Sequence, residues 1–171
     1  LKELDPERNE LFFATRVLFV EGDTEKLAFP EYARRLGIDL DKAGASIVEV
    51  GGKRNLLEFA GIAASFGIPV GIVYDEDSSE IKDENEEAAY NKQLDDLGVN
   101  RNRTWRFVKK YEDELKAAVG GDAAYQTLCQ KYPNVGKPTR ARLIAAADQT
   151  AIPPKVENIL SWLSGNEEGE E

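Results

Sequence analysis

Short apolar runs alternate with helical patterns over the first 110 residues, and this alternation constrains the fold more than any other feature. The apolar runs lie at residues 17–20, 46–50, 69–74 and 104–108. Helical spacing of apolar residues follows the first three runs, at residues 24–36, 53–66 and 83–97. Strands that alternate with helices pair in parallel, with the helices on the faces of the sheet, and their crossovers are right-handed. We therefore expect an α/β domain with a parallel four-stranded sheet.

The pattern changes after Lys110, where no further strand is indicated. Helical spacing continues at residues 111–119, 122–132, 139–148 and 154–163. We therefore divide the chain into residues 1–110, with an N-terminal segment at 1–15, a small helical subdomain at 111–165 and an acidic tail at 166–171. Within the first helical pattern, Pro30 predicts a kink or a separate first turn.

Several residue types are missing or rare, and this limits the chemistry. The chain has no histidine, which excludes His-based triads, His–Cys zinc sites and histidine acid–base catalysis. A single cysteine, Cys129, excludes an internal disulfide and suits a reducing compartment, so we expect a cytoplasmic protein. No apolar run is long enough for a membrane span, and we expect no signal peptide. Because the chain has no methionine, we expect it to be a piece of a longer protein.

The net charge of −10 opposes binding to nucleic acid, but the charge is unevenly distributed. Residues 75–96 hold ten acids and two lysines, a net of −8, and the tail adds −4, which leaves about +2 elsewhere. Basic residues gather in two groups, at residues 101–110 and 131–142. Binding to an anionic polymer therefore requires local positive charge or metal ions.

Acidic side chains follow the first and third predicted strands. Glu21 ends the first strand, and Glu25 lies one helical turn beyond it. Asp75 and Asp77 follow the third strand. Ligands of an open parallel sheet bind at the carboxyl ends of its strands, so these four carboxylates converge if the first and third strands are neighbours. Oxygen ligands favour Mg²⁺, Mn²⁺ or Ca²⁺, and so many acids suit a two-metal site that cleaves phosphodiester bonds.

Each part of this pattern also has a structural explanation. Asp23 and Glu25 favour a helix N-terminus, and Asp75 to Asp77 could form a solvated loop. The glycine turn before Lys53 lacks the Walker pattern, because Ile47 stands where the first glycine should be and Arg54 replaces the Ser/Thr. A receiver-like phosphoacceptor domain fits the acids only partly, since the spacing to Glu25 does not match.

The combined pattern is more specific than its parts, and it resembles the Toprim fold of topoisomerases, primases and certain nucleases. The segments VLFVEGDTEKLAFPEYARRLG and VEVGGKRNLLEFAGIAASFGIPVGIVYDEDSS resemble the Toprim nuclease of the OLD (overcoming lysogenization defect) family. The E-G-x-T-E form at Glu21 to Glu25 and the V-x-x-G-G-K-x-N segment at Val48 to Asn55 carry the likeness. The resemblance covers residues 10–80 well and the helical part less distinctly. It implies a Rossmann-like parallel four-stranded sheet with flanking helices.

The resemblance also implies roles for individual residues. Glu21 and Glu25 match the acids of the first motif, and Asp75 and Asp77 match the D-x-D motif. A further acid is implied after the fourth strand; we choose Glu112, with Asp113 and Glu114 as alternatives. Lys137 matches the family lysine that stabilises charge on the scissile phosphate. The remaining candidates, for contacts to substrate, are Lys53, Ser78 and Arg140.

By this resemblance the chain is a nuclease that cuts or nicks DNA with two Mg²⁺ or Mn²⁺ ions, while Ca²⁺ occupies the site without supporting cleavage. One ion, held by Glu25 and the D-x-D side, would orient water, and the other would neutralise the leaving 3′-oxygen. The family places an ABC-type ATPase before the nuclease, so we expect the ATPase, and the homodimerisation it carries, to lie outside this bacterial chain. Two alternatives stay open: a non-catalytic metal-binding or regulatory Toprim module, and a Toprim domain of the primase or topoisomerase type.

Overall fold

The computed structural model describes residues 10–76 and 81–166, and its centre is a parallel four-stranded sheet in the order β2-β1-β3-β4. The strands are β1 (Arg16–Val20), β2 (Ala45–Glu49), β3 (Val70–Asp75) and β4 (Arg103–Phe107). Val17 pairs with Ser46 on one side and with Val70 on the other, so β1 and β3 are neighbours, as the convergence of the acids requires. Each strand agrees with its prediction to within one residue at either end, and the α/β fold class is confirmed.

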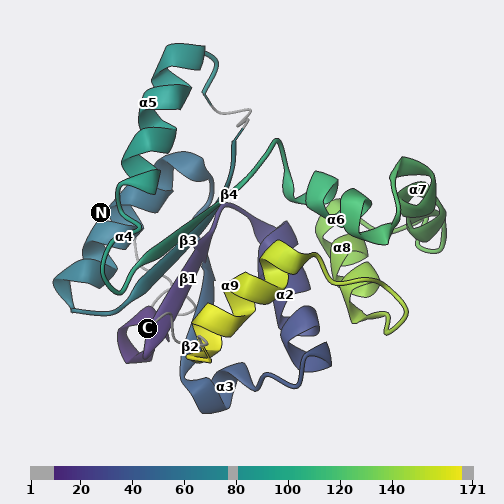
Figure 1. Cartoon of the computed structure of the whole chain (residues 1–171), viewed down its shortest axis with the longest axis horizontal. Helices are drawn as coiled ribbons and strands as arrows, with labels where there is room; N and C mark the ends of the chain where they lie inside the picture. The colour runs from purple at the N-terminus through teal and green to yellow at the C-terminus, as the bar shows by residue number, and fades with distance from the viewer. Residues whose placement is uncertain (1–9, 77–80, 167–171) are drawn as a thin grey trace.

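Helices cover both faces of the sheet (Figure 1). Their bounds are η1 (Glu10–Phe13), α2 (Asp23–Arg35), α3 (Leu40–Ala43), η2 (Lys53–Asn55), α4 (Leu56–Ser65), α5 (Glu84–Asp95), α6 (Tyr111–Val119), α7 (Asp122–Gln130), α8 (Lys137–Ala146) and α9 (Pro154–Ser164). Helices α4 and α5 pack on one face, where Phe19 and Ile72 meet Phe59 and Leu94. Helices α2 and α9 pack on the other face. Burial of strand side chains on both faces explains why the strands read as continuous apolar runs.

Two short segments differ from the sequence prediction. The turn α3 was not predicted; Asp39 caps it by accepting a hydrogen bond from the Lys42 N–H at 3.0 Å, and Gly44 ends it in a left-handed conformation. The predicted helix that starts at Lys53 begins instead as the 3₁₀ turn η2 before α4. Four-residue turns such as α3 are too short to produce a helical period, which is why the sequence did not reveal it.

The structure contradicts a separate first turn before Pro30, because α2 is one helix from Asp23 to Arg35 with Pro30 inside it. The alternative, a kink at Pro30, stays a prediction. Pro30 is exposed, so water can reach the carbonyl that its missing N–H leaves without a helical donor. Phe29 and Tyr32 on the opposite side are fully buried. The packing of that face holds the helix together across the proline.

The helical part after residue 110 does not form a separate core. Helix α8 packs along α2, and α9 returns to the sheet. One apolar cluster joins Leu18 and Phe29 with Leu115, Ile144 and Trp162, and so it crosses the predicted boundary at residue 110. The predicted boundary at residue 110 therefore marks a change in the sequence pattern, while the apolar core continues across it. Within the described residues, no helix combines the length and apolar character needed to cross a membrane.

Candidate metal site

The end of β1 supplies two carboxylates. Glu21 directly follows the strand, and Gly22 is the N-cap residue of α2. Glu25 lies in the first turn of α2 and is only 9% exposed. The helix therefore turns Glu25 back toward the strand ends, where its charge acts on those of Asp75, Glu112 and Glu21.

The glycine turn after β2 explains the V-x-x-G-G-K-x-N pattern. Gly51 and Gly52 both have positive φ angles, 75° and 114°, which side-chain-bearing residues rarely adopt. The Gly52 N–H donates to the Glu21 carbonyl at 2.8 Å, and the Asn55 side-chain amide donates to the Val50 carbonyl at 2.7 Å. The turn thereby binds the end of β1 and directs Lys53 inward.

Lys53 lies inside the protein and does not face solvent, with 0% of its surface exposed. Its ammonium donates to the carbonyls of Asp75 and Glu76 at 2.7 and 3.1 Å and to Glu87 Oε1 at 3.2 Å. This placement does not match the contact with substrate that the sequence suggested. The Lys53 ammonium therefore points into the protein interior and binds oxygens of the protein, not a phosphate.

The end of β3 carries Asp75, which is linked to both neighbouring strand ends. Its backbone N–H donates to Glu21 Oε1 at 2.7 Å, and its Oδ1 accepts from the Tyr111 N–H at 3.1 Å. The next residue, Glu76, donates its N–H to the Phe107 carbonyl at 2.9 Å. The Asp75 carboxylate is therefore held by a main-chain N–H at the start of α6, and the Asp75 main chain in turn holds Glu21.

Helices α6 and α8 contribute the last acid and the lysine. Glu112 lies in the first turn of α6, and its Oε1 is 2.7 Å from the Nζ of Lys137, the first residue of α8. The two alternative acids pair elsewhere: Asp113 with Lys116 at 3.2 Å, and Glu114 with Lys155 at 2.5 Å. Of the three adjacent acids, Glu112 is the one whose charge acts on Glu25 and Asp75.

Four carboxylates lie close enough to raise one another's pKa values. They are Glu21, Glu25, Asp75 and Glu112, and they are called the carboxylate site below. Burial, together with the charges of the other three carboxylates, raises the pKa of Glu25 to about 8, although a backbone hydrogen bond opposes the shift. Burial raises the pKa of Asp75 to about 6. A nearby cation would remove both shifts, because opposite charge favours the ionised carboxylate.

Lys137 provides part of that positive charge. Burial lowers its pKa, but the carboxylates of Glu112, Glu25 and Asp75 raise it, and the net shift is upward. Lys137 lowers the pKa of Asp75, and so does Lys110, a member of the basic group at residues 101–110. The lysine is therefore protonated throughout the physiological pH range, and its side chain is 63% exposed.

The donor chemistry of the carboxylate site fits hard divalent cations, since all its side-chain ligands are oxygens. Within residues 10–76 and 81–166, no three acidic side chains lie close enough together to coordinate one ion. The predicted ligand Asp77 and the predicted substrate contact Ser78 lie outside the described residues. Two observations therefore support binding of divalent cations by the carboxylate site: its oxygen donors and the raised pKa values of Glu25 and Asp75.

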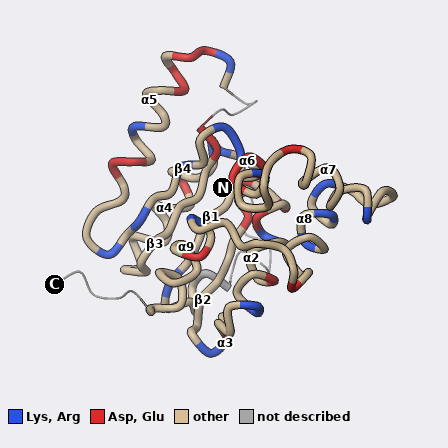
Figure 2. Tube along the Cα trace, turned by 45° about the vertical axis from the view of Figure 1, so that its right-hand side comes forward, with Lys and Arg blue, Asp and Glu red and all other residues tan. Residues whose placement is uncertain are grey.

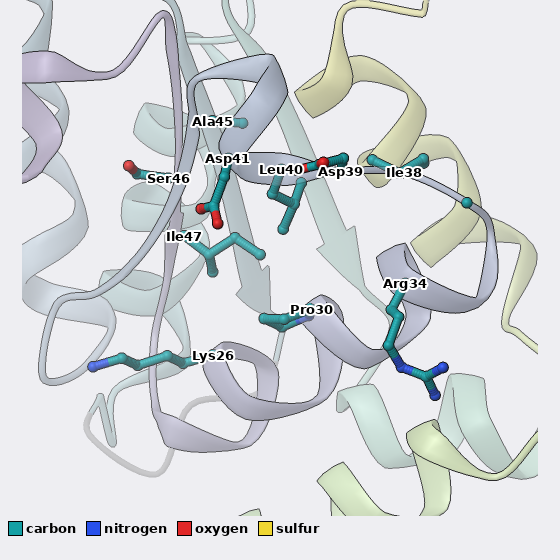
Figure 3. Close-up of a pocket in the computed structure, with 11 residues that line it drawn as sticks. Lys26, Pro30, Arg34, Ile38, Asp39, Leu40, Asp41, Ala45, Ser46 and Ile47 are labelled. Carbon is teal, nitrogen blue, oxygen red and sulfur yellow. The ribbon is translucent and has the colours of Figure 1, made fainter.

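Two other features lie outside the carboxylate site. Arg140 donates to the carbonyls of Tyr132 and Val135 at 3.2 and 3.0 Å, so it braces the loop before α8. A hollow of about 680 Å³ lies between α2, α3 and β2 (Figure 3). Its lining includes Lys26, Arg34 and Asp41 but no member of the carboxylate site. The hollow is thus separate from the carboxylate site.

Sequence reasoning did not single out the groups that position Asp75. The Tyr111 N–H is a main-chain donor, and Glu87 belongs to an acidic helix that reads as a solvated face. Figure 2 shows acidic segments recurring along α5, and nothing in the spacing of these acids distinguishes Glu87 from its neighbours. A lysine beside two glycines was the one available signal for this network.

Comparison with known proteins supports the same interpretation. Residues 12–77 match the model of the family described as overcoming lysogenization defect protein-like, Toprim domain. A curated relative, the OLD nuclease of Thermus scotoductus, is 34% identical over 124 residues. That match covers 68% of this chain but only 24% of the relative, so the chain spans about a quarter of the relative's length.

Solved structures extend the likeness to the helical part. The C-terminal region of the Xanthomonas campestris OLD protein superposes with a TM-score of 0.63 at 20% identity, covering 91% of this chain and 95% of that one. The C-terminal region of the Burkholderia pseudomallei OLD protein gives a TM-score of 0.64 at 20% identity, covering 90% and 98%. At these identities the likeness concerns the fold. Together with the family match, it confirms the resemblance that the sequence motifs indicated: residues 12–77 match an OLD-like Toprim domain, and the fold of the chain is that of OLD C-terminal regions.

Proposed function

We propose that this chain is the nuclease part of a larger protein and hydrolyses phosphodiester bonds in DNA with two divalent metal ions. The observation that carries the proposal is the burial of Glu25 among three other carboxylates, which raises its pKa to about 8. Such a site is electrostatically unfavourable alone and becomes favourable when cations bind. The name of the curated relative, OLD nuclease, supports the same activity.

The ions would be held by the carboxylate site, Glu21, Glu25, Asp75 and Glu112, together with Asp77. When bound, Mg²⁺ or Mn²⁺ supplies Lewis acidity that activates water and stabilises the leaving 3′-oxygen. The chain contributes the orientation of its ligands: the Tyr111 N–H fixes one oxygen of Asp75, and the Asp75 N–H fixes one oxygen of Glu21. Fixed ligands reduce the reorganisation that binding would otherwise require.

Lys137 would act on the substrate. It is exposed, positively charged and paired with Glu112 at the margin of the carboxylate site. A scissile phosphate that approaches the acids would meet this ammonium, which stabilises negative charge that develops in the transition state. No histidine is required in this arrangement, in agreement with the composition of the chain.

The proposal includes partners outside this chain. DNA is the substrate, and an ABC-type ATPase that precedes the nuclease in the same full-length protein forms the homodimer. The chain covers 24% of its curated relative, which leaves room for such a region. A reducing compartment such as the cytoplasm suits a sequence with one cysteine.

The experiment incubates the purified chain with supercoiled plasmid in Mg²⁺, Mn²⁺, Ca²⁺ or EDTA. Variants Asp75→Ala and Lys137→Ala test the two parts of the site, and Asp148→Ala, an exposed aspartate outside it, is the matched control. We expect nicked and linear plasmid in Mg²⁺ or Mn²⁺ only. Cleavage should be lost in Asp75→Ala, strongly reduced in Lys137→Ala and unchanged in Asp148→Ala.

Two results would count against the nuclease. Plasmid that stays intact in every metal would show that the chain does not cleave alone, and one tightly bound ion in that case would favour a metal-binding module. Cleavage that persists in EDTA or in Asp75→Ala would indicate a contaminating nuclease or a different site.

A further inference from the structure

The interior position of Lys53 requires an explanation that the proposed cleavage reaction does not supply. Its side chain is fully buried, and its ammonium contacts two main-chain carbonyls and one carboxylate. The ammonium also lies 5.2 Å from the centre of the Tyr74 ring. A buried charge is costly unless it is paired and hydrogen-bonded, and here every proton of the ammonium has an oxygen partner.

The two carbonyls that Lys53 holds belong to the residues at the end of β3. Asp75 and Glu76 offer their carbonyls to Lys53 and their N–H groups to Glu21 and Phe107. Both residues are thus fixed on the N–H side by the neighbouring strand ends and on the carbonyl side by Lys53. The Glu76 carbonyl also accepts from the Asn91 side-chain amide at 3.3 Å. Loss of the lysine would therefore remove the ammonium from the Asp75 carbonyl while Asn91 still holds the Glu76 carbonyl.

The partner on α5 completes this arrangement. Glu87 Oε1 lies 3.2 Å from Lys53 Nζ, and its side chain is 16% exposed. Helix α5 and the glycine turn are thereby joined through one ammonium to the end of β3. Side chains of this kind behind a metal ligand tune metal affinity, typically by 10–100-fold.

We propose that Lys53 is a positioning residue for the carboxylate site: it grips the main chain at Asp75 and Glu76 and thereby sets the affinity for divalent ions. This inference rests on the proposed function in that it takes Asp75 as a metal ligand. It assigns no contact between Lys53 and substrate, because the ammonium is enclosed. A lysine that only stabilised the core would affect stability and metal affinity together.

The test separates these two roles with paired variants. Lys53→Met removes the ammonium but leaves Glu87 without its buried partner, which is destabilising by itself. The double variant Lys53→Met/Glu87→Gln removes both charges and should recover most of the stability. Glu87→Gln alone keeps the hydrogen bonds from Lys53 to the two carbonyls. Lys92→Met, an exposed lysine of α5 that pairs with Asp96, is the matched control.

Three readouts are taken. Urea unfolding gives stability, and electron paramagnetic resonance of free Mn²⁺ gives the dissociation constant without DNA. Hydrogen exchange of the metal-free protein reports on the amides of Asp75 and Glu76. We expect the double variant to unfold near the wild-type midpoint, to bind Mn²⁺ about 10–100-fold more weakly and to exchange these two amides faster than those of β1. Glu87→Gln and Lys92→Met should bind Mn²⁺ as the wild type does.

The proposal would be overturned if the double variant bound Mn²⁺ and exchanged its amides as the wild type does. It would also be overturned if the variants lost Mn²⁺ affinity only in proportion to their loss of stability. Absence of Mn²⁺ binding in the wild type would overturn it as well. Failure of the nuclease proposal can be told apart from failure of this inference. A wild type that binds Mn²⁺ but leaves plasmid intact is no nuclease, and the Mn²⁺ affinities of the variants still decide the role of Lys53.

Discussion

The main-chain N–H of Asp75 donates to Glu21 Oε1 at 2.7 Å, so the acid after β1 is bonded directly to the last residue of β3. One oxygen of Glu21 is therefore engaged inside the protein. The two carboxylates belong to neighbouring parallel strands, and their relative position follows from the register in which Val20 pairs with Val73. The site is thus built into the sheet itself.

Replacement of Glu21 should separate this structural bond from metal binding. Glu21→Gln keeps an oxygen acceptor for the Asp75 N–H, so its free energy of unfolding should stay near that of the wild type. Glu21→Ala leaves a part-buried donor without this acceptor, which should lower stability by about 1–3 kcal/mol. Both variants should lose cleavage, since both lose a negative ligand. Urea unfolding and plasmid nicking measure the two effects; equal stability of both variants would contradict the role of the bond.

The stability of the metal-free protein should fall as the pH rises. The unfolded Glu25 carboxyl ionises near its ordinary pKa of 4.5, whereas burial keeps it protonated in the folded state up to about pH 8. Between these values the unfolded state binds fewer protons, so the free energy of unfolding decreases by at most about 1.4 kcal/mol per pH unit from this group. Asp75, whose pKa rises from 3.8 to about 6, adds to the fall at lower pH.

Glu25→Gln should flatten this dependence and exceed the wild type in stability at pH 8–9 in EDTA. Urea unfolding at a series of pH values is the measurement. Glu58→Gln, on the exposed side of α4, is the control and should follow the wild-type curve. A Glu25→Gln curve parallel to that of the wild type would mean that Glu25 is not buried as described.

Lys137→Ala should lower kcat for DNA cleavage by about 10²–10³-fold, the usual effect of removing one charge-stabilising donor. Stability should change by less than about 1 kcal/mol, because the side chain is 63% exposed and its ion pair with Glu112 is near the surface. Steady-state cleavage of a labelled duplex separates kcat from KM. Lys131→Ala, an exposed lysine of the loop before α8, should leave kcat unchanged. An equal loss in both variants would point to general DNA attraction.

Gly71→Ala should disturb the packing of α9 on the sheet. A Cβ at this position would lie 2.5 Å from a ring carbon of Trp162 and 2.8 Å from a methyl carbon of Leu18. Overpacking of this kind costs about 1–3 kcal/mol. Gly61→Ala in α4 meets nothing within 4 Å and should instead gain about 0.5–1 kcal/mol. Thermal unfolding of the two variants should therefore shift in opposite directions, and a stable Gly71→Ala would show that Trp162 does not contact the strand.

The strands were predictable because burial on both faces makes them continuous apolar runs, as in Val17 to Val20. The acids at the strand ends were predictable as a group because parallel strands end at one edge of the sheet. The order of the strands was not, because an apolar run carries no mark of its neighbour. The pairing of β1 with β3 therefore had to come from the structure.

Side chains in the helical part were harder to place. Successive residues of a helix point about 100° apart, so Glu112, Asp113 and Glu114 face three directions, and only the helix orientation selects among them. A signal was present: Leu115 is buried, and Glu112 lies three residues before it on the same side. The two glycines before Lys53 marked it in the sequence, but its burial was not predictable, because its partners at Asp75 and Glu76 are main-chain carbonyls, which every residue has.

Arg16 of β1 donates a hydrogen bond to the Trp162 carbonyl of α9, and its guanidinium lies 5.2 Å from the centre of the Trp162 ring. These two residues are 146 positions apart, and all the candidate ligands and Lys137 lie between them in the chain. During synthesis, β1 therefore emerges long before the helix that covers it. A chain interrupted before α9 would therefore carry the described candidate ligands and Lys137 and still leave the face of β1 that α9 covers without its partner.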